Sequence, residues 1–269
     1  MSRLEAALDE LRTLDTLAAR DTALARRDAR AQLLVTLSFL VTVVSFDRYS
    51  VAALLPLALF PAVLAAWGEV TARTLWRALA VAAPLALMVG LFNPLLDRSP
   101  MLSLGGLQLS GGWVSFSSIV LRVALAVSAA VILVAGTGMH GLCSALARFG
   151  APSVFTVQLL FLHRYLFVLS GEALRMGTAY RLRAGSRRLD LRLYASLTGQ
   201  LLLRSYDRAQ RVHQAMLARG FDGEVRTLNG LRWKQADTLF VAGWLSYFAL
   251  VRQVDLPLAL GRLLVGPDA

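Results

Sequence analysis

An arginine stripe in the last third of the chain has the clearest chemistry in this sequence. At helical spacing, arginines recur on one face of a segment that ends at Gly220. The stripe comprises Arg204, Arg208, Arg211 and Arg219, and Met216 lies on a less polar stripe beside it. Gly220 stands where a helix end needs a positive φ, which glycine adopts without strain. Arg219 can therefore project from the tip of a rigid helix, and this predicts docking into an acidic groove of a partner protein.

A second helix end of the same kind comes earlier in the chain. The pattern predicts a long helix from Val154 that ends at Arg183-Ala184-Gly185, and a second helix from about Leu191 to Arg219. Each helix could reach on the order of 40 Å at about 1.5 Å per residue. Two such helices favour a V or X of paired prongs. A partner with two equivalent sockets, such as a dimer, fits them.

Both features have a simpler interpretation as well. A basic helix beside a membrane is often only a surface that faces lipid headgroups. An Arg-Gly pair at a helix end is also a common C-terminal cap. Protein docking and anionic-lipid contact therefore both stay open, and the recurrence at two successive helix ends favours docking.

The rest of the chain, which must position these two helices, has the composition of membrane-spanning helices. The chain has 269 residues, of which 57% are hydrophobic and 17% charged, where a soluble domain carries about a quarter charged residues. Apolar runs long enough for a bilayer are expected at 33–46, 50–67, 74–96, 113–137 and 238–254. Residues 154–170 are apolar too, but His163 and Arg164 interrupt them, which leaves a sixth span open. We expect an all-α polytopic membrane protein with five to six transmembrane helices and two long crossed cytoplasmic helices.

This pattern divides the chain into four regions. Residues 1–32 form an N-terminal cytoplasmic amphipathic segment without a cleavable signal peptide, and residues 33–137 a four-span transmembrane region. Residues 138–235 form a domain in the cytoplasm and on the membrane surface. Residues 236–269 hold the last transmembrane helix and a tail. In that last helix Trp244, Tyr247 and Phe248 suit an aromatic belt at the membrane interface.

Positive charge is concentrated on one predicted side of the membrane. Residues 1–32, 68–77 and 138–235 hold 23 of the 28 lysines and arginines. The positive-inside rule therefore places the N-terminus in the cytoplasm and, with five spans, the C-terminus outside. A net charge of +11 beside membrane spans favours the lipid bilayer and an acidic partner over nucleic acid. Arg122 lies inside a predicted span, where structural and functional roles are both open.

The chain lacks the sequence motifs of catalysis. It has no phosphate-binding Gly-x-x-x-x-Gly-Lys-Ser/Thr loop, no Gly-x-Ser-x-Gly elbow and no His-Glu-x-x-His pair. Its three histidines have no metal-ligand spacing, and Cys143 is the single cysteine. We therefore expect a non-catalytic protein without catalytic, cofactor or metal residues, and ATP, where it is needed, bound by a partner.

Two segments carry a family resemblance. The sequences LHRYLFVLSGEALRM at 162–176 and RAQRVHQAMLARGFDG at 208–223 resemble the transmembrane T component of energy-coupling factor (ECF) ABC transporters. The branch most similar is the cobalt-type subunit CbiQ. The resemblance runs from LDTLA at 14–18 to about residue 235 and is strongest over 138–224.

The resemblance implies a role for both arginine-tipped ends. Ala218, Arg219 and Gly220 match the second of two Ala-Arg-Gly motifs, whose arginines dock in the subunits of an ABC ATPase dimer. The first motif stands here as Arg183, Ala184 and Gly185, with arginine and alanine transposed, and Arg181 could dock in place of Arg183. Arg204, Arg208, Arg211 and Met216 would support the second coupling helix.

The resemblance also implies partners and a location. The chain would be the coupling subunit of an importer in the bacterial inner membrane, supplying cobalt for cobalamin biosynthesis. Its partners would be the ATPase dimer and a cobalt-type substrate-binding membrane subunit, with or without a small accessory membrane subunit. The same scaffold could serve nickel, biotin or another vitamin. An alternative from a different class is a basic membrane anchor or lipid-binding protein.

Overall fold

The computed structural model divides the chain into two compact units, and each is described here by itself. It describes residues 9, 12–47, 49–96, 100–104, 107–184, 191–223 and 233–253. One unit, the membrane unit, comprises residues 14–142 and 231–269; the other, the paired-helix unit, comprises residues 1–13 and 143–230. Gly185, most of the N-terminal segment before Arg12 and the tail after Gln253 lie outside the described residues.

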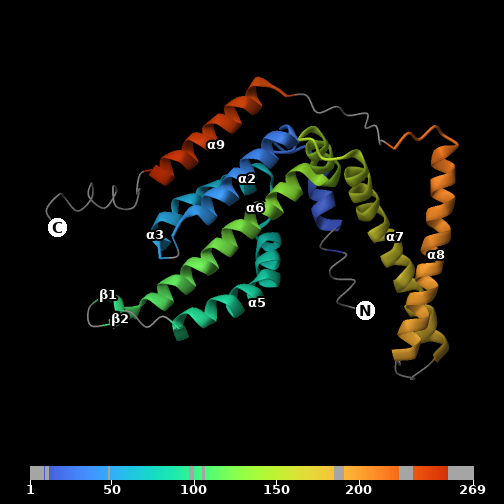
Figure 1. Ribbon diagram of the computed structural model, residues 1–269, viewed down its shortest axis with the longest axis horizontal. Helices are drawn as coiled ribbons and strands as arrows, with labels where there is room; N and C mark the ends of the chain where they lie inside the picture. Colours follow the sequence, from blue (N-terminus) through green and yellow to red (C-terminus); the bar gives the residue numbers. More distant parts are fainter. Residues whose placement is uncertain are drawn as a thin grey trace. The chain divides into compact units, whose positions relative to one another are not determined.

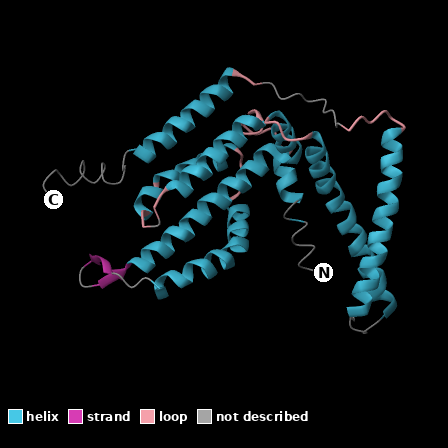
Figure 2. Ribbon diagram, viewed as in Figure 1, coloured by secondary structure: helices cyan, strands magenta, loops and turns pink. Residues whose placement is uncertain are grey.

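The membrane unit is built almost entirely from helices (Figure 1). Its elements are α2 (Ala29–Ser45), α3 (Val51–Leu54), the 3-10 helix η1 (Pro56–Ala58), α4 (Leu59–Trp67), α5 (Ala72–Leu96), β1 (Pro100–Leu104), β2 (Leu107–Ser110), the first part of α6 (Gly111–Arg148), and α9 (Gln235–Gln253). The antiparallel β1–β2 hairpin links α5 to α6 (Figure 2). The predicted all-α class is confirmed, and this short hairpin is its one addition among the described residues.

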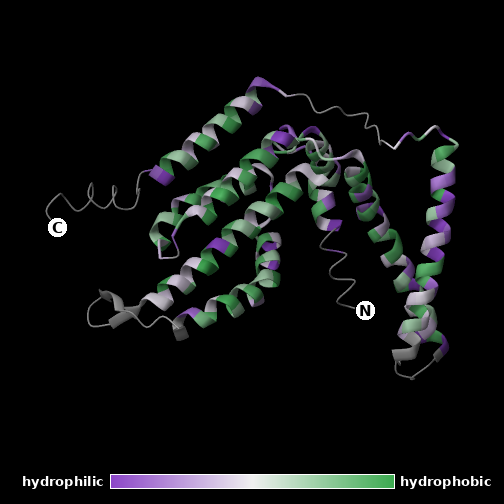
Figure 3. Cartoon of the chain, in the orientation of Figure 1, coloured by the Kyte–Doolittle hydropathy of each residue, from purple (hydrophilic) through white to green (hydrophobic). Residues whose placement is uncertain are grey.

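Within the described residues, three helices are long and apolar enough to cross a membrane, as the hydropathy colouring illustrates (Figure 3). They cover Ala72–Asn93, Gly111–Arg148 and Ser153–Arg183. Two shorter apolar helical stretches, Ala29–Ser45 and Val51–Trp67, form the predicted first hairpin. The second arm of that hairpin is broken at Pro56, because proline lacks the N–H that a continuous helix needs. The helix at Gln235–Gln253 is not among the three, so its spanning role stays a prediction.

A single glycine bends α6. Gly138 has a φ of 63°, outside the helical region, so the helix from Gly111 ends in effect there and a second one runs to Arg148. That second helix is closed at Gly150, which has a φ of 93°, and Ala151 N–H donates to the carbonyl of Leu146 over 3.1 Å.

An aromatic cluster joins α2, α4 and α9 in the core of the membrane unit. The ring centroids of Phe39 and Phe60 lie 4.5 Å apart, and Phe248 lies 5.3 Å from Phe60. Trp244 meets Phe60 edge to face at 4.9 Å, and Tyr247 donates its hydroxyl hydrogen to the carbonyl of Pro56 over 2.7 Å. These rings thus pack against the first hairpin, and the expected interfacial belt on α9 stays a prediction.

The paired-helix unit contains the two long helices that the sequence predicted. The first, α7 (Ser153–Ala184), and the second, α8 (Leu191–Leu217), run antiparallel and approach each other along part of their lengths (Figure 1). The second helix ends two residues before the predicted Arg219. Residues 218–220 form the turn that closes it.

Candidate docking site

The end of α8 is a well-formed helix stop that leaves Arg219 at the tip. Gly220 N–H donates to the carbonyl of Leu217 over 3.0 Å, and Phe221 N–H donates to the carbonyl of Met216 over 3.1 Å. These two bonds, with a φ of 79° at Gly220, form a Schellman motif. Arg219 is the C-cap residue, and its side chain is exposed. The positive φ that the sequence predicted at Gly220 is confirmed.

The end of α7 presents a second exposed arginine. Arg181 Nη2 donates to the hydroxyl of Thr178 over 3.3 Å, so this guanidinium lies back along the helix. Arg183 is exposed and forms no ion pair or side-chain hydrogen bond within the described part of the chain. The helix ends at Ala184, and Gly185, the predicted stop, lies outside the described residues.

The two arginine-bearing ends lie at opposite ends of α8. The end of α7 leads through a short link to the start of α8, whereas Arg219 closes the far end of the same helix. The 27 residues of α8 separate the two ends by about 40 Å at 1.5 Å per residue. The pair can therefore reach two sites on one partner that are this far apart.

The arginine stripe divides into residues with different surroundings. Arg204 Nη1 lies 2.7 Å from Oε1 of Glu172 on α7, and Arg175 Nη2 lies 2.7 Å from the other oxygen of the same carboxylate. Glu172 is thus paired with one arginine of α7 and one of α8. Arg208 and Arg211 are exposed and form no ion pair with any described residue.

An apolar groove of about 730 Å³ runs between the first half of α7 and the second half of α8. Its walls include Phe161, Tyr165 and Leu169 from α7, and Val212 and Met216 from α8. The polar members of the lining include Gln158, Arg208 and His213. The less polar stripe beside the arginines, which contains Met216, therefore forms one wall of this groove.

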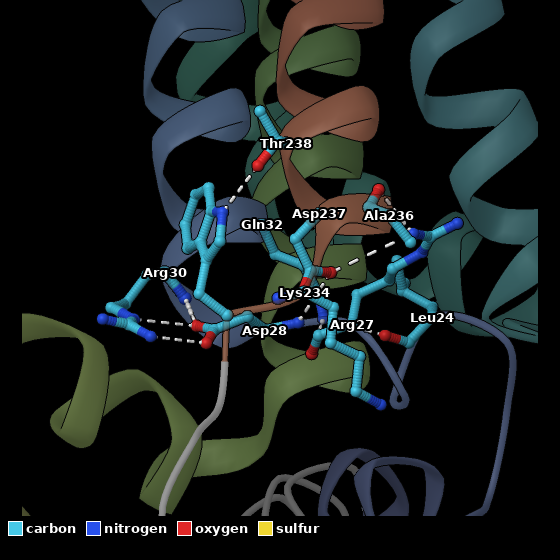
Figure 4. Close-up of polar contacts among 10 residues, drawn as sticks. Leu24, Arg27, Asp28, Arg30, Gln32, Lys234, Ala236, Asp237 and Thr238 are labelled. Atoms are coloured by element: carbon cyan, nitrogen blue, oxygen red, sulfur yellow. Dashed lines mark hydrogen bonds and ion pairs between the residues drawn. The ribbon is translucent and has the colours of Figure 1, made fainter.

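A cluster of polar residues that the sequence analysis did not single out joins α2 to α9 (Figure 4). We call it the polar clasp, and it consists of Leu24, Arg27, Asp28, Arg30, Gln32, Lys234, Ala236, Asp237 and Thr238. Trp233 belongs to it as well, since its indole N–H donates to the hydroxyl of Thr238 over 2.7 Å. Asp237 is 1% exposed, and its carboxylate accepts from the backbone N–H groups of Lys234 (2.9 Å) and Asp28 (3.3 Å). Arg27 Nη1 donates to the carbonyl of Ala236 over 2.7 Å and lies 4.0 Å from Asp237.

The second half of the polar clasp is the N-terminus of α2. The buried Asp28 carboxylate caps the helix by accepting from Arg30 N–H over 2.9 Å, and it also binds the Arg30 guanidinium at 2.8 Å. The buried Gln32 side chain donates to the carbonyl of Leu24 over 2.9 Å. In the loop before the clasp, a hydrogen bond from Arg26 lowers the pKa of the Asp21 carboxyl below its ordinary value. These contacts hold the loop that leads into the first apolar helix.

The opposite end of α2 is met by two arginines that lie in or near predicted spans. Arg122 Nη2 on α6 donates to the carbonyl of Asp47, and Arg122 Nε donates to the hydroxyl of Ser118 over 3.2 Å. Arg252 Nε on α9 donates to the hydroxyl of Ser45 over 3.2 Å. The last carbonyls of a helix lack intrahelical partners and carry partial negative charge, which attracts a cation to the end of α2 at Ser45 and to Asp47 just beyond it. Arg122 therefore has a structural contact that explains a cation at this position.

Neither a metal site nor a catalytic constellation is visible in the parts of the chain with described positions. No group of three or more His, Cys, Asp or Glu residues lies close enough to hold a metal ion there. His163 packs edge to face on Phe167 at 5.3 Å, and Cys143 is buried. The candidate functional residues are instead arginines, which lie exposed at helix ends or form contacts between helices.

Comparison with known protein families shows to which family the chain belongs. The family model described as cobalt transport protein CbiQ matches residues 21–228, which is most of the chain. The chain belongs to the CbiQ family of cobalt transport proteins. The match includes the polar clasp residues of α2, both helices of the paired-helix unit and the Arg219 end, and it stops before α9.

Two curated relatives of this CbiQ-family chain are similar over shorter segments. The cobalt transport protein CbiQ of Rhodobacter capsulatus is 34% identical over 115 residues, which is 42% of this chain and 47% of that relative. An uncharacterized protein of Methanocaldococcus jannaschii, MJ1571, is 27% identical over 124 residues, or 45% of this chain and 42% of the relative. The similarity thus spans less than half the length of either relative.

Proposed function

We propose that this membrane protein of the CbiQ family is the coupling subunit of an ECF-type ABC importer. In this role α7 and α8 transmit the movement of an ATPase dimer to a substrate-binding membrane subunit. The observation that carries the proposal is the geometry of the arginine-bearing helix ends. Arg219 caps a Schellman-closed tip, and Arg183 is exposed about 40 Å away, at 1.5 Å per residue of α8.

The two ends have the chemistry that a pair of acidic grooves would recognise. A guanidinium held at a rigid helix end loses little side-chain freedom on binding and can bind a carboxylate through two hydrogen bonds. We assign the first tip to Arg183, since Arg181 already donates to Thr178. ATP binding and hydrolysis belong to the partner in this proposal. In this proposal the chain itself contributes no cofactor or metal ligand.

We further propose cobalt as the cargo and the bacterial inner membrane as the location. Support for cobalt comes from the family and from the R. capsulatus relative, which is named a cobalt transport protein. The substrate-binding subunit would be of the cobalt type, with or without a small accessory membrane subunit. Nickel, biotin or another vitamin are the alternative cargoes. Support for a cytoplasmic N-terminus comes from the positive-inside distribution of lysine and arginine.

A second candidate function is supported by Arg208 and Arg211. Both are exposed without an ion pair in the described part of the chain, and Arg208 lines the apolar groove. Cations beside an apolar surface suit anionic lipid headgroups, as in a basic membrane anchor or lipid-binding protein. Under that function, any exposed arginine of α8 contributes about equally to binding.

Co-purification with the ABC ATPase encoded nearest to this chain tests the proposal. Arg219→Glu and Arg183→Glu each place a negative charge where an acidic groove must bind, which costs several kcal/mol at a desolvated interface. We expect the ATPase to capture the wild type but neither variant. The matched control is Arg211→Glu, an exposed arginine of α8 away from the tip, which should be captured normally. Equal capture of all variants would refute the docking role.

The same variants separate the two candidate functions. Binding to vesicles of mixed neutral and anionic phospholipid is measured at two salt concentrations. If the chain is a lipid-binding protein, Arg211→Glu should weaken vesicle binding as much as Arg219→Glu does. If it is a coupling subunit, neither variant should weaken vesicle binding, and only ATPase capture should separate Arg219→Glu from Arg211→Glu.

A further inference from the structure

The contact between α7 and α8 contains one charged connection at a distinctive place. Glu172 of α7 binds Arg204 of α8 at 2.7 Å, and Arg175 occupies the other carboxylate oxygen at the same distance. The Glu172 side chain is 20% exposed, whereas that of Arg204 is 61% exposed. Glu172 is therefore held by its neighbour on α7 and can act as a fixed anion toward α8.

The position of Arg204 along α8 suits this ion pair to the transmission of movement between the two helices. Arg204 is the central residue of α8, with thirteen residues between it and each end of Leu191–Leu217. Glu172 lies twelve residues before the end of α7 at Ala184. The pair thus lies about 20 Å from each arginine-bearing end at 1.5 Å per residue. An ion pair at this point connects α7 to α8 midway between the two arginine-bearing ends, so that a displacement of the Arg219 end can be passed on to the Arg183 end.

The apolar walls of the groove do not select one register by themselves. Groove-lining residues recur every three or four positions on both helices, as at Phe161, Tyr165 and Leu169 and again at Ala209, Val212 and Met216. A slide of α8 by one turn, about 5.4 Å, would replace one set of apolar contacts by a similar set. The same slide would carry Arg204 away from Glu172.

We infer that Glu172 is a positioning residue that fixes the register of α7 on α8 by holding Arg204 at the centre of α8. This inference rests on the proposed coupling function for its consequence, since a fixed register lets the two docking ends move together. The geometric part stands without a partner protein. Arg208, one turn further along α8, is the next cation and forms no ion pair within the described residues.

Removal of the Glu172–Arg204 ion pair should change the register of α7 on α8 more than it changes the folding of either helix. Ion pairs with one highly exposed member contribute little to stability, so neutral variants should keep both helices. The suitable changes are Glu172→Gln and Arg204→Gln, which keep most of each side chain. Arg208→Gln is the matched control, because it removes an equal charge from the same helix without touching Glu172. Arg204→Lys is the conservative variant, because it keeps a cation near the carboxylate.

The first measurement uses the full chain in nanodiscs without any partner. Spin labels are placed at Leu182→Cys and Gln214→Cys, two exposed positions near the ends of α7 and α8, in a Cys143→Ala background. Pulsed electron paramagnetic resonance then gives the distribution of label distances. We expect a narrow distribution for the wild type and Arg208→Gln, and at least a twofold wider one for Glu172→Gln. Arg204→Gln should add a population displaced by about one turn, because Arg208 becomes the nearest cation.

Three results of this measurement would overturn the inference. The first is a distribution in Glu172→Gln as narrow as in the wild type. The second is equal widening in Arg208→Gln and Arg204→Gln, which would indicate a general charge effect. Arg204→Lys should stay close to the wild type, and a spread as wide as in Arg204→Gln would also contradict the role of the charge pair.

The second measurement uses the complex with the ATPase and the substrate-binding subunit in proteoliposomes. Glu172→Gln should leave ATPase capture unchanged and reduce Co²⁺ uptake per ATP hydrolysed several-fold, whereas Arg164→Gln, which removes an exposed charge from α7, should leave both unchanged. Unchanged uptake per ATP in Glu172→Gln would refute its part in transmission. If the ATPase fails to capture even the wild type, the proposed function fails, and the distance measurement still decides the register role.

Discussion

The backbone N–H of Asp28 donates to the carboxylate of Asp237 over 3.3 Å, although the two residues are 209 positions apart. Each residue also organises the start of its own helix. Asp28 is the N-cap of α2, and Asp237 accepts the N–H of Lys234 just before α9. Both acids are buried. Helices α2 and α9 are therefore joined at their N-termini by the Asp237 carboxylate, which accepts a hydrogen bond from the start of each.

The Asp237→Ala variant tests how much this contact stabilises the protein. The change leaves two backbone N–H groups without their acceptor in a buried place, which costs about 1–3 kcal/mol for each such group. We expect a clearly lower midpoint of thermal unfolding for the purified protein in detergent. Asp21→Ala, which breaks an ion pair of two exposed residues, should leave the midpoint nearly unchanged. Equal midpoints for both variants would contradict a stabilising polar clasp.

Substitutions of Arg122 test whether this cation in a predicted membrane span stabilises the fold or takes part in transport. Its guanidinium donates to the carbonyl of Asp47, two residues past the end of α2 at Ser45. Arg122→Leu removes a charged donor from this carbonyl and should destabilise the protein by roughly 1.5–3 kcal/mol. Arg122→Lys should recover part of the loss, because a lysine cation can still donate. Both are measured by unfolding in detergent.

A transport measurement completes the test of Arg122. Uptake by the reconstituted complex is divided by the amount of folded subunit present. A structural cation predicts that this ratio is unchanged in Arg122→Leu. A large fall in the ratio in a variant of normal stability would instead assign Arg122 to the transport path.

Two glycines of the same helix region should respond oppositely to alanine. Gly220 has a φ of 79°, and a Cβ there would meet no atom within 4 Å, so Gly220→Ala acts through backbone strain alone. Left-handed backbone costs a residue with a Cβ about 1–2 kcal/mol, so the α8 stop should fray and ATPase capture should weaken. Gly199 lies inside α8 with equally open space, and Gly199→Ala should favour the helix by about 0.5–1 kcal/mol.

The readout for this pair combines ATPase capture with helix content. Circular dichroism of the purified protein should show no loss of helix in Gly199→Ala, and ATPase capture should stay at the wild-type level. Weaker capture in Gly220→Ala alone would link the Schellman geometry to docking. If both alanine variants bind the ATPase like the wild type, the shape of the α8 end does not matter for docking.

Local signals explain why the paired helices could be predicted from sequence. Gly138, Gly150 and Gly220 each mark a helix end, and each has a positive φ because its helix stops or bends there. These signals need only the neighbouring residues. Asp28 also carries such a signal, an N-cap acid before an apolar run, although the analysis of motifs passed over it.

Contacts between distant segments explain what the sequence could not provide. The partner of Glu172 lies on another helix, and the partner of Asp28 lies beyond the paired-helix segment, so no spacing rule connects them. The contacts of the aromatic residues on α9 could not be predicted for the same reason. A helix rich in Trp and Tyr suits an interfacial belt, but its packing partner Phe60 on α4 is revealed only by the tertiary fold.

Phe60 provides the sharpest test of how α9 is attached to the membrane unit. Its ring lies 4.5 Å from Phe39, 4.9 Å from Trp244 and 5.3 Å from Phe248, and its side chain is fully buried. Phe60→Ala should cost about 3–5 kcal/mol, because it removes buried apolar contacts and leaves a cavity. Phe60→Leu keeps most of the volume and should cost much less.

The location of the damage distinguishes local loosening of α9 from global unfolding. Limited proteolysis in detergent reports which segment opens first. Because the ring joins α2 and α4 to α9, Phe60→Ala should expose α9 to cleavage under conditions in which α7 and α8 stay intact. Val154→Ala, at an exposed position of α7, serves as the control and should cleave like the wild type. Simultaneous cleavage of all helices in Phe60→Ala would show that the aromatic cluster holds the whole chain together rather than α9 alone.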